Sequence, residues 1–315
     1  MVLKQILEVF ELMDKPQANG KEIIDLLKER GATEVSMETV IGERGKTDSI
    51  KILIAGSEGK TAGGSAPTLG IIGRLGGLGA RPTMTGFVSD GDGALAAVAA
   101  GLKLAEMHTN GDVLKGDVII ATHICPDAPT QDHKPVPFMN SPIDMATCNA
   151  KDVDERMDAI LSIDTTKGNQ VINVNGFAIS PTVKEGYILK TSADLLAIMS
   201  QVTGSLPAVF PLAQQDITPY GNDVYHLNSI LQPATATDVP VVGVAITTEQ
   251  PVAGCATGAS QPMAIESAAR FAIEVAKVFG QGECFFYDEE EYQRLLQLYG
   301  DLKIFQTFGS MKNDR

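Results

Sequence analysis

The segment between positions 86 and 130 carries two clusters of side chains whose types are those of metal ligands and acid–base catalysts. The clusters are Asp90 with Asp92, and His123 with Cys125 and Asp127. A stretch predicted to be a helix over 94–108 and one predicted to be a strand over 117–122 separate them. Because open α/β sheets place their chemistry in loops at the carboxyl ends of strands, we expect the active site here.

The first cluster follows a predicted strand over 84–88 and directly precedes the helix, with glycines between its members. One carboxylate in this place would cap the helix and interact favourably with its dipole. Two carboxylates in a glycine-containing turn also suit a divalent cation. Asp90 and Asp92 are therefore candidate metal ligands, with the capping role as the alternative.

The second cluster begins at His123, where the predicted strand over 117–122 ends. Two of the four histidines of the chain, His123 and His133, lie in this window, and prolines stiffen it. Imidazole and carboxylate ligate zinc or manganese and also act as general bases. We expect His123 to ligate or catalyse and Asp127 to be the general base. Packing of His123 in the strand end is the alternative.

Two further positions carry candidate site residues. Asp164 ends the predicted strand over 159–163 and is a candidate metal ligand. Asp223 and His226 are three residues apart and would share one face if their segment were helical. Both are candidate substrate-binding residues, and a helix-capping or surface role is the alternative.

A glycine-rich segment over 247–260 follows a predicted strand within 238–247 and precedes a predicted helix over 265–279. Free backbone amides at a helix start would bind a substrate carboxylate and lower a thiol pKa. The candidates for substrate binding are Gly254, Thr257, Gly258 and Ser260. Cys255 is the candidate nucleophile or acid–base thiol, and a buried inert cysteine is the alternative.

The composition bounds the function. The chain has 315 residues and a formal net charge of -14, which argues against nucleic-acid binding and against docking on an anionic membrane. The glycine-rich stretches lack the spacing of a phosphate-binding loop or a dinucleotide fingerprint, so no nucleotide cofactor is expected. The amphipathic start is not a signal peptide, and we expect a cytoplasmic protein. An apolar N-terminal helix could serve a homo-oligomer interface.

Strands alternate with helices along the chain, which predicts an α/β fold with a mainly parallel sheet. We expect one domain over 1–315, with an N-terminal helical segment over 1–45 and a C-terminal helical tail over 281–315.

The sequences SDGDGALAAVAAGLKLAEMHTNGDVLKGDVIIATHICPDAPT and VGVAITTEQPVAGCATGAS carry a first resemblance. Over nearly the whole chain they are similar to a bacterial domain-of-unknown-function family, number 1177. That resemblance brings no activity with it.

The order of elements over roughly 48–280 also resembles the di-zinc aminopeptidases of the glutamyl and deblocking type. The resemblance implies a three-layer α/β/α sandwich with a mainly parallel mixed sheet, zinc-exopeptidase-like. It aligns Asp90, or else Asp92, with a bridging aspartate, Asp164 with a later aspartate ligand, and Asp223 with a Gly-Thr-Asp stretch near the site. The early His-x-Asp pair and the closing histidine of that family have no counterpart here. A metal would need a rebuilt set, namely Asp90, His123, Asp127 and Asp164.

Three hypotheses follow. The first is a hydrolase of a small amino-acid or peptide-derived substrate, assisted by a divalent metal such as zinc or manganese. The second is a protein that kept the fold, lost its metals and binds or senses a small molecule with a carboxylate. The third comes from a resemblance of 254–258 to the Cys-Gly-Thr-Gly motif of proline racemases, which implies thiol-based racemisation with Cys125 paired to Cys255.

Overall fold

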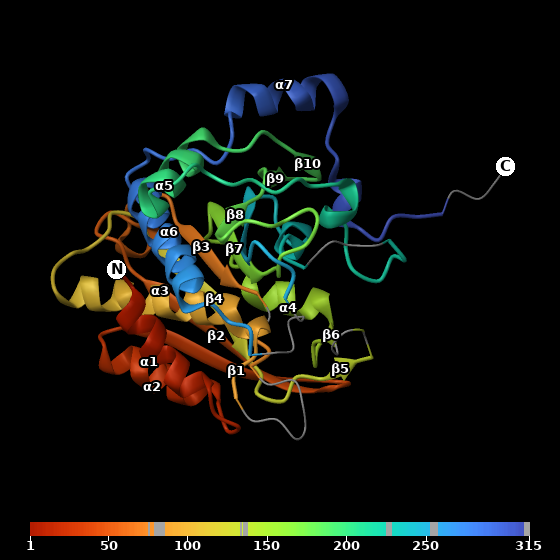
Figure 1. Cartoon of the computed structure of the whole chain (residues 1–315). Helices are drawn as coiled ribbons and strands as arrows, with labels where there is room; N and C mark the ends of the chain where they lie inside the picture. Colours follow the sequence, from red (N-terminus) through yellow and green to blue (C-terminus); the bar gives the residue numbers. More distant parts are fainter. Residues whose placement is uncertain are drawn as a thin grey trace.

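The computed structural model describes residues 1–74, 76–78, 86–132, 134, 138–224, 229–252 and 258–311. Within these residues, nine strands form one mixed sheet in the order β1-β2-β4-β3-β7-β11-β9-β10, with β8 paired to β11 (Figure 1). Its strands are β1 (Glu34–Gly42), β2 (Gly45–Ile54), β3 (Leu69–Gly73), β4 (Val118–Ile124), β7 (Ala159–Thr165), β8 (Gly176–Ile179), β9 (Val183–Lys184), β10 (Tyr187–Ile188) and β11 (Val241–Thr247). Two short strands, β5 (Thr130–Gln131) and β6 (Phe138–Met139), pair separately.

The four central strands β4, β3, β7 and β11 run parallel to one another, whereas β2 and β8 flank them antiparallel. These central strands are buried along their length except at Thr165, the half-buried last residue of β7, as expected for strands covered on both faces. Their carboxyl ends therefore meet at one edge of the sheet, which we call the carboxyl edge. This arrangement confirms the predicted α/β fold with its parallel centre.

Helices cover one face of the sheet and a thinner layer covers the other. The helices are α1 (Leu3–Met13), α2 (Gly20–Glu29), α3 (Asp92–Thr109), α4 (Met145–Asp152), α5 (Ala193–Thr203), α6 (Pro262–Gly280) and α7 (Glu289–Tyr299). The 3-10 turns are η1 (Lys60–Ala62), η2 (Ser89–Gly91), η3 (Gln214–Ile217), η4 (Gln232–Thr235) and η5 (Lys303–Gln306). α3 and α6 lie on the sheet, with α1 and α5 packed outside them, and α4 with η4 belongs to the opposite layer.

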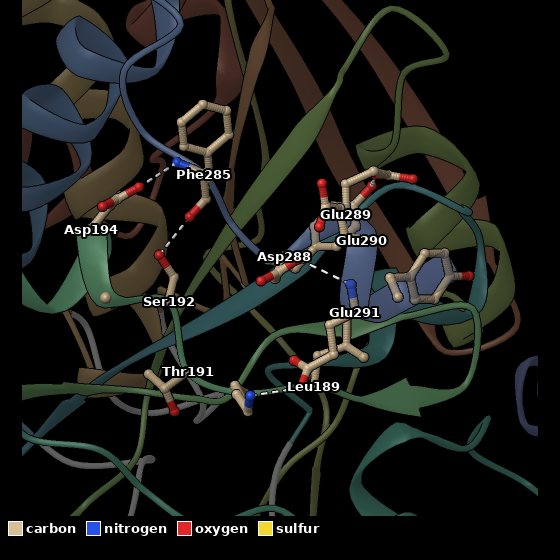
Figure 2. A pocket seen from close by; sticks show the side chains of 13 residues that line it. Leu189, Thr191, Ser192, Asp194, Phe285, Asp288, Glu289, Glu290 and Glu291 are labelled. Atoms are coloured by element: carbon tan, nitrogen blue, oxygen red, sulfur yellow. Dashed lines mark hydrogen bonds and ion pairs between the residues drawn. The ribbon is translucent and has the colours of Figure 1, made fainter. Parts of the chain in front are cut away.

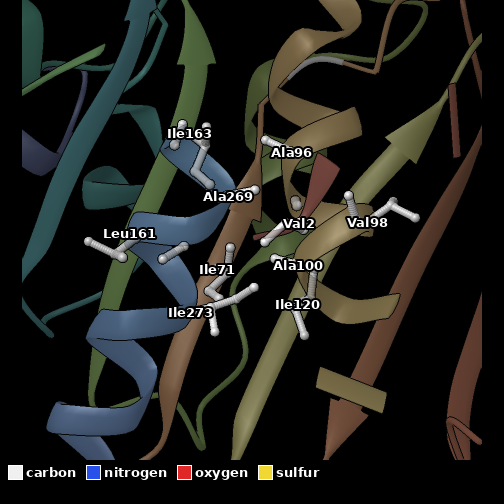
Figure 3. Packing of buried hydrophobic residues seen from close by; sticks show 14 of the residues in the cluster. Val2, Ile71, Ala96, Val98, Ala100, Ile120, Leu161, Ile163, Ala269 and Ile273 are labelled. Atoms are coloured by element: carbon white, nitrogen blue, oxygen red, sulfur yellow. The ribbon is translucent and has the colours of Figure 1, made fainter. Parts of the chain in front are cut away.

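Small side chains bring α3 close to the sheet (Figure 3). Its alanines, such as Ala96 and Ala100, face Ile71 and Ile120 of β3 and β4 in one buried cluster. Isoleucine and valine on the strands fill the space that alanine leaves, and burying such side chains stabilises the fold by about 1.5–3 kcal/mol each. In the part of the chain that the structure describes, no helix combines the length and apolarity needed to cross a membrane.

Two local expectations differ from the structure. The segment expected to be helical over 1–45 contains α1 and α2 but continues into the strand β1. β1 is an edge strand whose residues are mostly exposed, so its sequence has no clear apolar alternation. The predicted strand over 84–88 is wrong where it is described. Residues 86–88 run as a loop into η2, because Gly86 has a φ of 122° and the Phe87 amide donates to Asp14 Oδ1 at 2.5 Å.

Candidate active site at the carboxyl edge of the sheet

Polar side chains replace apolar ones where the central strands end. His123 on β4, Arg74 just after β3, and Asp164 on β7 lie on neighbouring strands, on the face opposite α3. The parallel register pairs Ile72 with both Ala121 and Ser162, so these three residues, each two positions further on, form one row across the sheet. All three are buried. Arg74 and His123 are 49 positions apart in the chain, and His123 and Asp164 are 41 apart. The parallel pairing of their strands brings them side by side.

Asp164 occupies the centre of this edge and is only 2 % exposed. Its Oδ2 accepts a hydrogen bond from Ser229 Oγ at 2.8 Å, and its Oδ1 accepts one from the Thr165 amide at 2.7 Å. Burial raises the pKa of Asp164 to about 6, because desolvation outweighs the stabilisation that Ser229 and Arg74 give the carboxylate. A buried acid that titrates near neutral pH is typical of a catalytic site.

Asp92 begins α3 and lies on the other side of the same strand end, with no exposed surface. Ser260 Oγ donates to its Oδ1 at 2.5 Å, and both Thr165 Oγ1 and Lys167 Nζ lie 3.4 Å from its Oδ2. Burial raises the pKa of Asp92 to about 6, and Lys167 is the main opposing influence. Thr165 therefore links the two acids, since its hydroxyl reaches Asp92 while its amide holds Asp164.

Two glycines allow α3 to start this close to the sheet. A Cβ atom on Gly93 would lie 2.4 Å from the Ile163 carbonyl oxygen, and one on Gly73 would lie 2.7 Å from the Gly93 carbonyl oxygen. Only residues without a side chain fit this contact. Gly93, which directly follows the predicted metal ligand Asp92, thus has a packing role that places Asp92 beside β7.

The Arg74 side chain is fully buried and forms an ion pair with Asp152 at the end of α4, 2.9 Å from Nη1 to Oδ2. The same Nη1 donates to Asn149 Oδ1 at 3.0 Å, and Nη2 donates to Met145 Sδ at 2.8 Å. This pair connects the carboxyl edge to the second layer. Sequence analysis did not identify Arg74, although a lone arginine in the apolar run GIIGRLGG is a usable signal.

The His123 ring is buried and both of its nitrogens have partners. Nε2 accepts a hydrogen bond from the Gly76 amide at 3.3 Å, and Nδ1 lies 2.8 Å from Thr47 Oγ1, whose hydroxyl donates to the Ile124 carbonyl. Nδ1 is therefore the protonated nitrogen. Burial, and then the positive charge of Arg74, lower the pKa of His123 to about 4. In this arrangement His123 is a neutral residue of the strand end, and its role as ligand or catalyst stays a prediction.

The remaining residues of the two clusters are Asp90, Asp127 and Cys125. Asp90 is buried in η2 beside Gly77, since a Cβ atom on Gly77 would lie 3.0 Å from Asp90 Oδ2. Asp127 is exposed in the turn after β4. Cys125 Sγ is 4.0 Å from Asp127 Oδ1, and burial followed by that carboxylate raises the pKa of Cys125 to about 12. Cys125 is thus protonated at neutral pH, which disfavours it as one of two racemising thiols.

The predicted substrate-binding residues separate into three groups. Ser260 lies beside Asp92, as described above, and Gly258 is exposed two residues before it. Asp223 is exposed with a φ of 60°, so the described part of its segment is not helical. The other predicted residues, namely Gly254, Cys255, Thr257 and His226, lie outside the described residues.

Residues 38–309 match a family described as "Protein of unknown function (DUF1177)". The chain belongs to the DUF1177 family. This membership confirms the first resemblance. No curated protein matches the DUF1177 chain.

Solved structures share the fold of this DUF1177 protein. The bottromycin maturation enzyme BotP is 14% identical, with a TM-score of 0.54, and the match covers 90% of this chain and 70% of that chain. The LapA aminopeptidase of Legionella pneumophila is 13% identical, with a TM-score of 0.45 over 87% of this chain and 71% of that one. Together with the layers described above, the BotP match shows that the DUF1177 protein shares the α/β/α fold of that enzyme.

A metal does not fit the donors that the structure describes. Outside the gaps in the described chain, no three His, Cys, Asp or Glu side chains come together as a metal site would need. Asp92 already has three protein donors, and both nitrogens of His123 are hydrogen-bonded. The predicted set of Asp90, Asp92, His123 and Asp164 is therefore not assembled into one group here.

Besides Arg74, three residues of the site were missed from the sequence, namely Lys167, Ser229 and Tyr220. Tyr220 lies near Asp164 and Ser229, and burial followed by the Asp164 charge raises its pKa. Lys167 directly follows Asp164-Thr165-Thr166, so its place after the strand was a signal. Ser229 had none, because it is 65 residues from its partner.

The structure also contains a pocket of about 580 Å³ away from the carboxyl edge (Figure 2). It is formed by residues 189–194 and 285–292, around the starts of α5 and α7. Two of its acids are used within the fold: Asp194 accepts from the Phe285 amide, and Asp288 caps α7 through the Glu291 amide. None of the described site residues lines it, so the chemistry and this pocket are separate features.

Proposed function

We propose that this protein hydrolyses an amide bond in a small amino-acid- or peptide-derived substrate, with Asp164 as the group that moves the proton. The observation that carries the proposal is a buried carboxyl with a pKa of about 6 at the carboxyl end of a central parallel strand. A general base works best when its pKa is near the working pH. The fold shared with BotP, a maturation enzyme, supports the peptide-derived substrate class.

In the proposed reaction, ionised Asp164 takes a proton from a water molecule as the water oxygen bonds to the amide carbonyl carbon. The proton then passes from Asp164 to the amide nitrogen while the carbon–nitrogen bond breaks. The products are a carboxylic acid and an amine, and Asp164 is ionised again. Ser229 and the Thr165 amide fix the direction of the carboxylate throughout.

Asp92 has a positioning role in this proposal. Its contacts with Lys167 and Ser260, together with the hydrogen bond from Lys167 Nζ to the Ala259 carbonyl at 3.0 Å, hold the end of the glycine-rich segment against the start of α3. That segment is the one we expect to receive the substrate carboxylate. A fixed end reduces the conformational entropy that binding would have to overcome.

The test uses mass spectrometry on mixtures of dipeptides and N-acyl amino acids incubated with the wild type, Asp164→Asn and Asp25→Asn. Asp25 is an exposed acid paired with Lys21 and serves as the matched acid-to-amide control. We expect at least one compound to be cleaved, the rate to fall by about 10²–10⁴-fold in Asp164→Asn, and the control to keep its rate. A cleaved substrate that Asp164→Asn turns over at the wild-type rate would refute the role of Asp164.

A second candidate is a protein that binds a small carboxylate without turnover. The observation that favours it is that Asp92 is neutralised by protein donors and that the described residues hold no three-ligand metal group. It predicts that a carboxylate ligand raises the melting temperature while the ligand is recovered intact. Any product would favour the hydrolase.

A further inference from the structure

Protein groups contact both oxygens of the Asp92 carboxylate, where a bound cation would otherwise lie. One oxygen accepts from Ser260, and the other lies 3.4 Å from both the Thr165 hydroxyl and the Lys167 ammonium. The carboxylate has no exposed surface and the Lys167 side chain is 9 % exposed. A buried carboxylate is stable only when such partners replace its hydration.

The Lys167 ammonium is also held in place. Its Nζ donates to the Ala259 carbonyl at 3.0 Å, so the backbone before α6 and the carboxylate at the start of α3 both bind the same ammonium. A divalent cation on the same carboxylate oxygen would lie within a few ångströms of this ammonium. Like charges this close repel each other, and little solvent screens them at a buried carboxylate.

We infer that the Lys167 ammonium takes the place of a divalent cation at Asp92, so that the carboxyl edge assembles with a cation supplied by the chain itself. The inference rests on the proposed functional site but not on the proposed reaction. Its prediction concerns metal binding and melting temperature, whereas the reaction is judged by product formation. Each can therefore fail without the other.

The test compares the wild type, Lys167→Arg and Lys167→Met after treatment with EDTA, with and without added Mn²⁺. Methionine keeps the length of the side chain and removes its charge, and arginine keeps the charge. We expect Mn²⁺ to leave the melting temperature of the wild type and Lys167→Arg unchanged and to raise that of Lys167→Met by several degrees. Adding Asp92→Asn to Lys167→Met should abolish the rise, because the carboxylate is the expected ligand.

Two results would overturn the inference. One is a wild type that Mn²⁺ stabilises and that loses this response in Asp92→Asn. The other is a folded Lys167→Met that ignores Mn²⁺. If Lys167→Met does not fold in EDTA, the variant is instead produced with and without Mn²⁺ in the growth medium, and the yield of folded protein is compared. Folded protein obtained only with the metal supports the inference, and failure in both media counts against it.

Discussion

Arg74 and Asp152 form an ion pair inside the protein, with 2.9 Å between Nη1 and Oδ2 and side-chain exposures of 0% and 2%. The pair joins the end of β3 to the end of α4, and Asn149 shares the same guanidinium nitrogen. It lies in the row that also holds His123 and Asp164, so the carboxyl edge and the second layer depend on one another.

Replacing one partner of this pair should destabilise the protein far more than replacing both with apolar residues. We expect Arg74→Met or Asp152→Leu to lower the free energy of unfolding by about 3–5 kcal/mol, because each leaves a buried polar partner uncompensated. The double variant Arg74→Met/Asp152→Leu should recover most of the loss. Urea unfolding of the four proteins gives the coupling energy, and simple additivity of the two losses would show that the pair is not coupled.

Asp164 should make the protein less stable as the pH rises. Its pKa is about 6 in the folded protein against 3.8 for an ordinary aspartate. Between about pH 4 and pH 6 the unfolded chain therefore loses this proton first, and the stability that the protonated form provides is lost as the pH passes 6. Relative to the wild type, Asp164→Asn should gain up to about 3 kcal/mol between pH 4 and pH 7. Urea midpoints at both pH values measure this, and a constant difference would contradict it.

His123 should make the protein less stable as the pH falls, opposite to the effect of Asp164. Its pKa is about 4 in the folded protein against 6.5 for an ordinary histidine, so the unfolded chain takes up the proton first as the pH falls. The stability it provides is present above pH 6.5 and decreases by up to about 3 kcal/mol towards pH 4. In His123→Gln, whose amide oxygen can still accept from the Gly76 amide, this decrease should be absent. Thermal unfolding from pH 4.5 to 7.5 distinguishes the two proteins.

A methyl group on Gly93 should displace the start of α3. The new Cβ would lie 2.4 Å from the Ile163 carbonyl oxygen, so we expect Gly93→Ala to lose about 1–3 kcal/mol despite the better helix propensity of alanine. Gly258→Ala is the control, because its Cβ would meet nothing within 4 Å. Equal unfolding free energies for the two variants would show that α3 tolerates the shift.

Ser229 should set the pH at which Asp164 works. The Ser229 hydrogen bond lowers the Asp164 pKa and thus opposes the effect of burial. If hydrolysis is found, Ser229→Ala should move the acidic limb of the kcat/KM profile to higher pH, whereas a merely structural role would lower the rate at every pH alike. Ser229→Thr, which keeps the hydroxyl, should restore the wild-type profile.

Much of the fold was readable from local patterns. Apolar runs such as 159–163 and 241–247 are buried strands of the centre, and the alanine-rich run after Asp92 is the helix that packs on them. β1 was missed because an exposed edge strand has no apolar periodicity to detect. The strand predicted over 84–88 was wrong because apolar residues beside a glycine of positive φ do not have to extend.

The candidate site shows the same division. Asp92, Asp164 and Ser260 could be named from the sequence, because each stands where a strand ends or a helix starts. Their partners could not, since Ser229 reaches Asp164 across 65 positions and Ser260 reaches Asp92 across 168. By itself, the sequence determined which elements form and which loops hold the polar residues, because periodicity and capping are local. Only the tertiary structure decided that Lys167 compensates Asp92 and that His123 is neutral, because charge and hydrogen bonding depend on burial and on neighbours brought from distant strands.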